Sequence, residues 1–186
     1  MNTQIWKDAL VFLALVTLGV VTRLIPYYTP VESWNLNAVA AIAVFSGFYF
    51  RNWMVALVAA ALPMLVGDAI IQKYDMRMMA LIHASQLLPV FLGPWLREKL
   101  GLARIGIAAL AASIVFFVVS NGAYWWCYKA HTTAELTKAY VDAIPFFRGT
   151  LLGNLAFSAV MFGVYAVAVH RGWIADAKPQ AEPATV

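Results

Sequence analysis

Six apolar stretches, each close to membrane-spanning length, constrain the fold of this chain more than any other feature. A bilayer core is crossed by about 20 helical residues. Backbone polar groups in hydrocarbon must be paired within the protein, so such stretches predict α-helices. We therefore expect an all-α fold, an integral membrane bundle of about six transmembrane helices. The stretches are Val11–Leu24, Leu36–Phe50, Met54–Ile71, Met78–Leu96, Ile105–Val119 and Leu151–Val169.

The composition is that of a membrane protein. Apolar residues make up 63% of the chain and charged residues 12%, whereas a soluble domain carries about a quarter charged residues. We expect one transmembrane domain over residues 1–176 and a disordered tail over residues 177–186. The net charge of +4 comes without a basic stripe or nucleic-acid motif. It indicates contact with the lipid bilayer and does not predict a nucleic-acid partner.

The distribution of basic residues predicts the orientation. Arg97, Lys99 and Arg104 crowd one short connection, and such a cluster is hard to translocate. We expect a multi-pass protein of the bacterial inner (cytoplasmic) membrane with both termini in the cytoplasm. The outer connections are then the long ones. The longest, Ser120–Arg148, is rich in aromatic residues, and we expect a loop that forms a lid over an outward-facing pocket.

Two polar residues at membrane depth, Asp68 and His83, are the strongest functional candidates, because ionisable groups in hydrocarbon are costly. Asp68 is read either as a functional carboxylate or as a helix-end charge that faces water or Lys73. His83 is read as a metal ligand, a proton relay or a hydrogen-bonded packing residue. No second histidine lies three or four residues away, so we expect no intrinsic metal or cofactor.

Further candidates for binding a substrate are amide, aromatic and methionine side chains, most of them near the outer ends of the predicted helices. Amides both donate and accept hydrogen bonds, and aromatic and methionine side chains cover apolar ligand surfaces. No Ser-His-Asp order, HExxH or P-loop is present, so we do not expect an enzyme. The candidate substrate-binding residues, to which Ala80 is added as a neighbour of His83, are Tyr28, Asn37, Asp68, Tyr74, Met79, Ala80, His83, Asn121, Tyr124, Trp125, Tyr128, Phe146, Arg148 and Asn154.

Four segments resemble the BtuM-type vitamin B12 transporters, which are similar to the six-helix substrate-binding (S) components of energy-coupling-factor (ECF) transporters. The resemblance implies an outward-facing pocket that binds and takes up cobalamin or a related corrinoid. S components usually dock on an ATP-driven ECF module through Ala-x-x-x-Ala in the first helix, but Ala9 and Ala14 are five residues apart here. The segments are NLNAVAAIAVFSGFYF, LPMLVGDAI, FFVVSNGAYWW and IPFFRGTLLGNLAFSAVMFGVY.

The resemblance also implies a cobalt-ligating cysteine near the start of the fourth helix. The matching stretch, MRMMALIHAS, has Ala80 and His83 and no cysteine. These two residues are three positions apart, nearly one helical turn, so we expect both to face the same cavity. Either the chain binds without that bond, or His83 replaces it as a ligand to the cobalt of a bound corrinoid, or the position has been altered. Two further functions stay open: an S component for another small vitamin, and a small intramembrane enzyme that uses Asp68 and His83.

Overall fold

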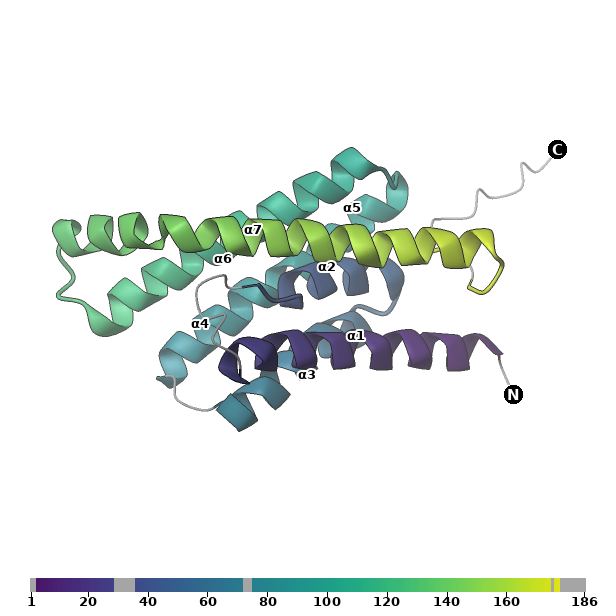
Figure 1. Cartoon of the computed structure of the whole chain (residues 1–186), viewed down its shortest axis with the longest axis horizontal. Helices are drawn as coiled ribbons and strands as arrows, with labels where there is room; N and C mark the ends of the chain where they lie inside the picture. The colour runs from purple at the N-terminus through teal and green to yellow at the C-terminus, as the bar shows by residue number, and fades with distance from the viewer. Residues whose placement is uncertain (1–2, 29–35, 72–74, 175, 178–186) are drawn as a thin grey trace.

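The computed structural model describes residues 3–28, 36–71, 75–174 and 176–177, and these form a helical bundle with no strand among them. The two ends of the described chain lie at the same end of the bundle (Figure 1), as the predicted even number of crossings requires. We call this the inner end, and the end with the α6–α7 turn the outer end. The elements are α1 (Thr3–Tyr28), α2 (Val39–Tyr49), α3 (Trp53–Ile71), α4 (Met76–Leu87), η1 (Leu88–Leu92), α5 (Gly93–Glu98), α6 (Leu102–Tyr128) and α7 (Thr133–His170).

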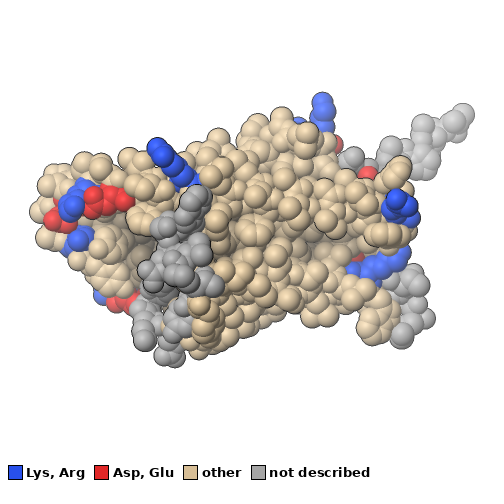
Figure 2. Space-filling model, viewed as in Figure 1, with Lys and Arg blue, Asp and Glu red and all other residues tan. Residues whose placement is uncertain are grey.

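Within the described residues, five helical segments are long and apolar enough to cross a membrane, counting α4, η1 and α5 as the single segment Met76–Glu98. Large apolar side chains cover their outward faces, for example Leu10 at 66% and Val164 at 64% exposure. Figure 2 shows most of the visible charged residues gathered at the two ends, with a broad uncharged band between them. This distribution is that of a multi-pass membrane protein.

The sixth predicted crossing is a short helix in the centre of the bundle. α2 has 11 residues, and all of them are buried. Its inner half packs on α7 through an aromatic cluster in which the ring centroids of Phe48 and Tyr165 lie 5.0 Å apart. Its backbone is in direct contact with that of η1 and α5, since a Cβ atom added at Gly47 would overlap the Val90 carbonyl and one added at Gly93 would overlap the Gly47 backbone. α2 therefore forms the core around which the long helices are arranged.

Side-chain hydrogen bonds fix the outer end of α2. The Thr22 hydroxyl of α1 accepts a hydrogen bond from the Ala38 N–H at 3.2 Å, and the Asn37 Oδ1 accepts one from the Val39 N–H at 3.2 Å. These bonds satisfy two of the N–H groups that a helix start leaves unpaired. They place Asn37 and the start of α2 beside the outer half of α1.

Two proline residues lie where the fourth apolar segment changes from α4 to η1 and α5, and a third lies within the continuous helix α3. Pro89 lies in the 3-10 segment η1, and Pro94 lies in the first turn of α5. Both positions suit a residue without a backbone donor. Pro63 lies inside α3 and packs against Gly19 of α1, where a Cβ atom would overlap the proline ring. The first and third helices are therefore in close contact at mid-membrane.

The expected long outer loop over Ser120–Arg148 is wrong. α6 continues to Tyr128 and α7 begins at Thr133, so only a short turn separates them. α7 has 38 residues, or about 57 Å at 1.5 Å per residue, which exceeds a hydrocarbon core of about 30 Å. Its first turns therefore extend beyond the core, where charged residues are accommodated, and the expected lid is a helical hairpin.

Candidate functional site

Three ionisable side chains from three helices meet near the outer end of the bundle. Asp68 of α3 forms an ion pair with Arg23 of α1, and its Oδ2 lies 2.6 Å from Nε2 of His83 on α4. The side chains of Asp68, Arg23 and His83 are 6%, 16% and 17% exposed. The structure shows Asp68 as a buried, paired carboxylate and not as a helix-end charge that faces water. Lys73, its alternative partner, lies outside the described residues.

The chemistry of the three groups sets their hydrogen-bond roles. A carboxylate only accepts hydrogen bonds, so in this contact the His83 Nε2–H is the donor and the Asp68 Oδ2 the acceptor. In the neutral imidazole the lone pair then lies on Nδ1. In many metal sites a histidine binds the metal through one ring nitrogen while the other donates a hydrogen bond to a carboxylate, which fixes the orientation of the ring. Arg23 offsets the charge of Asp68, which would otherwise be costly at this depth.

A cavity of about 110 Å³ adjoins the cluster. The Gln86 side chain lines it and is 3% exposed, and its Oε1 has no hydrogen-bond partner. An unpaired buried acceptor is costly, so this atom is suited to an N–H or O–H group of a bound molecule. The lining residues are Arg23, Asn37, Asp68, Met79, Ile82, His83, Gln86 and Phe116.

Four of the predicted substrate-binding residues therefore come together here: Asn37, Asp68, Met79 and His83. Ala80 was expected to share a cavity with His83, but it is exposed and is not among the lining residues. Sequence reasoning missed Arg23 and Gln86 as members of the site. Gln86 lies three residues beyond His83, so the helical repeat could have placed both on one face.

The other predicted residues lie elsewhere. Asn121, Tyr124 and Phe146 line a cavity of about 220 Å³ between α6 and α7. Asn154 is buried and donates a hydrogen bond to the Ser113 Oγ at 2.8 Å, whereas Tyr28 and Arg148 are exposed. The single outward cavity that we expected is thus divided, and Tyr74 lies outside the described residues.

The remaining two aromatic candidates hold the α6–α7 hairpin in place. The Trp125 Nε1 donates to the Thr132 carbonyl at 3.1 Å, and the Tyr128 hydroxyl accepts from the Asp75 N–H at 3.3 Å. The Asp75 side chain also accepts hydrogen bonds from Arg77, which lowers the pKa of the Asp75 carboxyl. The hairpin is thereby joined to the start of α4.

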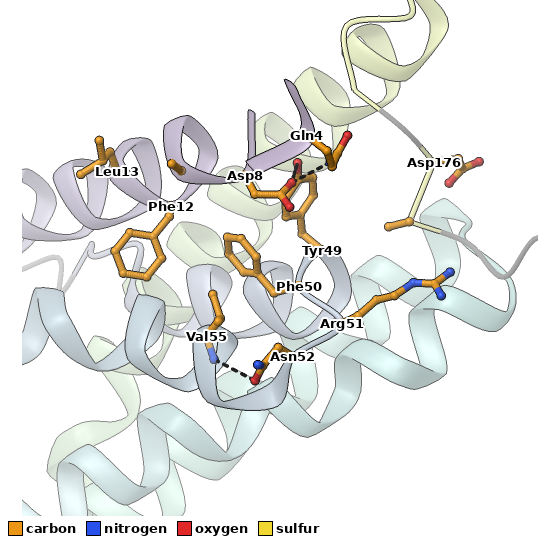
Figure 3. Close-up of a pocket in the computed structure, with 12 residues that line it drawn as sticks. Gln4, Asp8, Phe12, Leu13, Tyr49, Phe50, Arg51, Asn52, Val55 and Asp176 are labelled. Carbon is orange, nitrogen blue, oxygen red and sulfur yellow. Dashed lines mark hydrogen bonds between the residues drawn. The ribbon is translucent and has the colours of Figure 1, made fainter. Parts of the chain in front are cut away.

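A larger cavity, which sequence reasoning missed, lies at the inner end (Figure 3). This inner groove has a volume of about 850 Å³. Asp8 accepts hydrogen bonds there from the Gln4 Nε2 at 2.8 Å and the Tyr49 hydroxyl at 3.0 Å. Its lining residues are Gln4, Asp8, Ala9, Phe12, Leu13, Tyr49, Phe50, Arg51, Asn52, Val55, Asp176 and Ala177.

A family model described as a family of unknown function, DUF6580, matches residues 3–177. No curated protein and no solved structure matches the chain.

Proposed function

The chain belongs to DUF6580, a family of unknown function, and we propose that it is a membrane transport protein that takes up cobalamin or a related corrinoid. The choice of a corrinoid as the ligand rests on the sequence resemblance, and the choice of the binding site rests on the geometry of the described residues. The observation that carries the proposal is the hydrogen bond between Asp68 and the His83 Nε2 at 2.6 Å. It orients an imidazole at the edge of a buried polar cavity.

Two groups in the site suit a corrinoid. In the neutral imidazole the His83 Nδ1 keeps a lone pair, and imidazole nitrogen is a good ligand for a transition metal. The unpaired Oε1 of Gln86 can accept a hydrogen bond from one of the amide groups at the rim of a corrinoid. In this proposal His83 contacts the corrinoid, and cobalt is part of the transported substrate.

The size of the cavity adds a requirement to the proposal. A cavity of about 110 Å³ admits a single amide arm and is too small for a corrin ring. Binding the whole ligand therefore requires the outer ends of α4 and α6 to separate from α1, since Met79, Phe116 and Arg23 line the cavity from these three helices.

The test is the visible absorbance of protein purified from cells that were supplied with cobalamin. We expect a corrinoid spectrum, and we expect His83→Ala to weaken binding and to shift that spectrum. His170→Ala is the matched control, because His170 is exposed at the end of α7. Purified protein without a corrinoid spectrum, even at saturating cobalamin, would contradict the proposal, and retention of another small vitamin would then favour an S component for that vitamin.

One contact favours a second candidate, a small intramembrane enzyme. Asp68 and His83 come from different helices and still form a hydrogen bond, the relationship by which an acid orients a general base. The described lining residues include no hydroxyl or thiol nucleophile, so the base would have to activate water. Hydrolysis of a lipid or peptide substrate that His83→Ala abolishes, in protein that binds no corrinoid, would favour this function.

The proposed uptake raises the question of whether the protein needs an ATP-driven partner. An S component without its own ATP-binding motif requires either an ECF module or a solitary mode of transport. Ala9 and Ala14 do not form Ala-x-x-x-Ala, so we propose the solitary mode. Uptake of cobalamin in cells that lack an ECF module would support it, and uptake only when a module is co-expressed would contradict it.

A further inference from the structure

We propose that the inner groove binds one membrane phospholipid whose zwitterionic headgroup carries a primary ammonium, that is, a phosphatidylethanolamine. The groove lies where the inner ends of α1, α2 and α3 meet, and Asp176 and Ala177 close one side of it. Its lining combines an apolar wall with side chains of both charges. Each part matches one part of such a lipid.

The apolar wall is open to the bilayer. It includes Phe12 and Leu13 of α1 together with Phe50 and Val55, and the rings of Phe12 and Phe50 pack edge to face with their centroids 6.3 Å apart (Figure 3). Leu13 is 59% exposed and Val55 is 36% exposed, and both lie on helices that are long enough to span the membrane. An acyl chain can therefore enter the groove directly from the bilayer and cover its apolar wall without passing through water.

The anionic side of the groove is built around Asp8. Both hydrogen bonds that Asp8 accepts, from Gln4 and from Tyr49, end on its Oδ1. They hold the carboxylate in place, while Oδ2 accepts no hydrogen bond from the described part of the chain and can take a further donor. Asp176 is the second carboxylate of the lining, and its Oδ1 accepts a hydrogen bond from the Tyr165 hydroxyl at 2.7 Å.

The cationic side is Arg51, in the connection between α2 and α3. Its exposed guanidinium extends away from the apolar wall (Figure 3). Helix α3 begins two residues later, and the positive end of its dipole adds to the positive potential around Arg51. Such a guanidinium can bind a phosphate through paired, charge-assisted hydrogen bonds.

The charges decide between classes of lipid. A purely anionic headgroup would satisfy Arg51 but would be repelled by Asp8 and Asp176. A phosphate with an attached ammonium satisfies both sides. A choline headgroup keeps the positive charge but has no N–H to donate to the Asp8 Oδ2, so the geometry favours the primary ammonium.

The first experiment uses the unmodified full-length protein in detergent and native mass spectrometry. Phosphatidylethanolamine, its mono- and dimethyl derivatives, phosphatidylcholine and phosphatidylglycerol are offered in equal amounts. We expect retention to fall along the methylation series by about tenfold in all, the loss expected for one charge-assisted hydrogen bond. Equal retention of all five lipids would overturn the proposal, and so would a preference for phosphatidylglycerol.

Variants then test the two charged sides. Asp8→Asn should remove the preference for the ethanolamine headgroup over choline, and Arg51→Gln should weaken retention of both. The controls are Asp142→Asn and Arg171→Gln, which change exposed charges outside the groove. Unchanged lipid selectivity in Asp8→Asn would overturn the proposal. If Asp8→Asn does not fold, the methylation series on the unmodified protein decides alone.

Discussion

The side chain of Arg23 lies directly against Gly67, where a Cβ atom would overlap its Cδ and Nε atoms. Arg23 lies on α1, and its ion-pair partner Asp68 is the residue after this glycine on α3. The absence of a side chain at position 67 therefore lets the guanidinium pass close to the backbone of α3 and reach the carboxylate.

We expect Gly67→Ala to displace Arg23 and to destabilise the protein by about 1–3 kcal/mol, the usual cost of overpacking. Thermal unfolding in detergent, followed by circular dichroism, measures the change. Gly106→Ala is the matched control, because an added Cβ there meets nothing and alanine favours a helix. Equal losses in both variants would show that Gly67 has no special role.

The ion pair itself is tested by a double-mutant cycle. Removing one partner leaves a buried charge, so we expect Arg23→Met and Asp68→Leu each to cost about 3–5 kcal/mol. The double variant should be more stable than either single variant, since no uncompensated charge remains. Additive losses in unfolding experiments on the three variants would mean that the two residues act independently.

A third prediction concerns the contact between α2 and η1. A Cβ at position 47 would overlap the backbone carbonyl of Val90, which cannot move aside as a side chain can. We expect Gly47→Ala to cost about 3 kcal/mol or more and to broaden the size-exclusion peak. Gly163→Ala on α7, where an added Cβ meets nothing, should leave the peak unchanged. A stable, monodisperse Gly47→Ala protein would contradict the packing described.

The orientation can be tested by cysteine labelling in a Cys127→Ala background, which removes the native thiol. A cysteine at Ala130, in the α6–α7 turn, should react with a membrane-impermeant maleimide in intact cells. One at Asn52, between α2 and α3, should react only after permeabilisation. The reverse pattern would place the termini outside the cytoplasm.

The sequence predicts the bundle well because apolar length is a property of each helix alone. It fails at Ser120–Arg148 for a physical reason. The apolar run ends near Val119, but α6 continues to Tyr128 through aromatic residues suited to the membrane interface. Hydropathy marks the end of the hydrocarbon core, and the helix does not end there.

The site could be predicted only in part. Asp68 and His83 stand out in the sequence because ionisable groups at membrane depth are rare. Their hydrogen bond depends on how α3 and α4 rotate against each other, which one sequence does not specify. The inner groove has no comparable signal, because Phe12, Tyr49 and Arg51 are ordinary residues at the ends of apolar segments.

The short central helix has a consequence for biogenesis. α2 has 11 residues and measures about 16 Å, roughly half of the hydrocarbon thickness. A segment of this length is not retained in a bilayer alone, so α2 must enter together with α3 as a hairpin. The chain that follows covers α2 in two stages, first with α3, η1 and α5 and then with α6 and α7, which also contact it. Burial of the central helix is therefore complete only once the last two helices have packed against it.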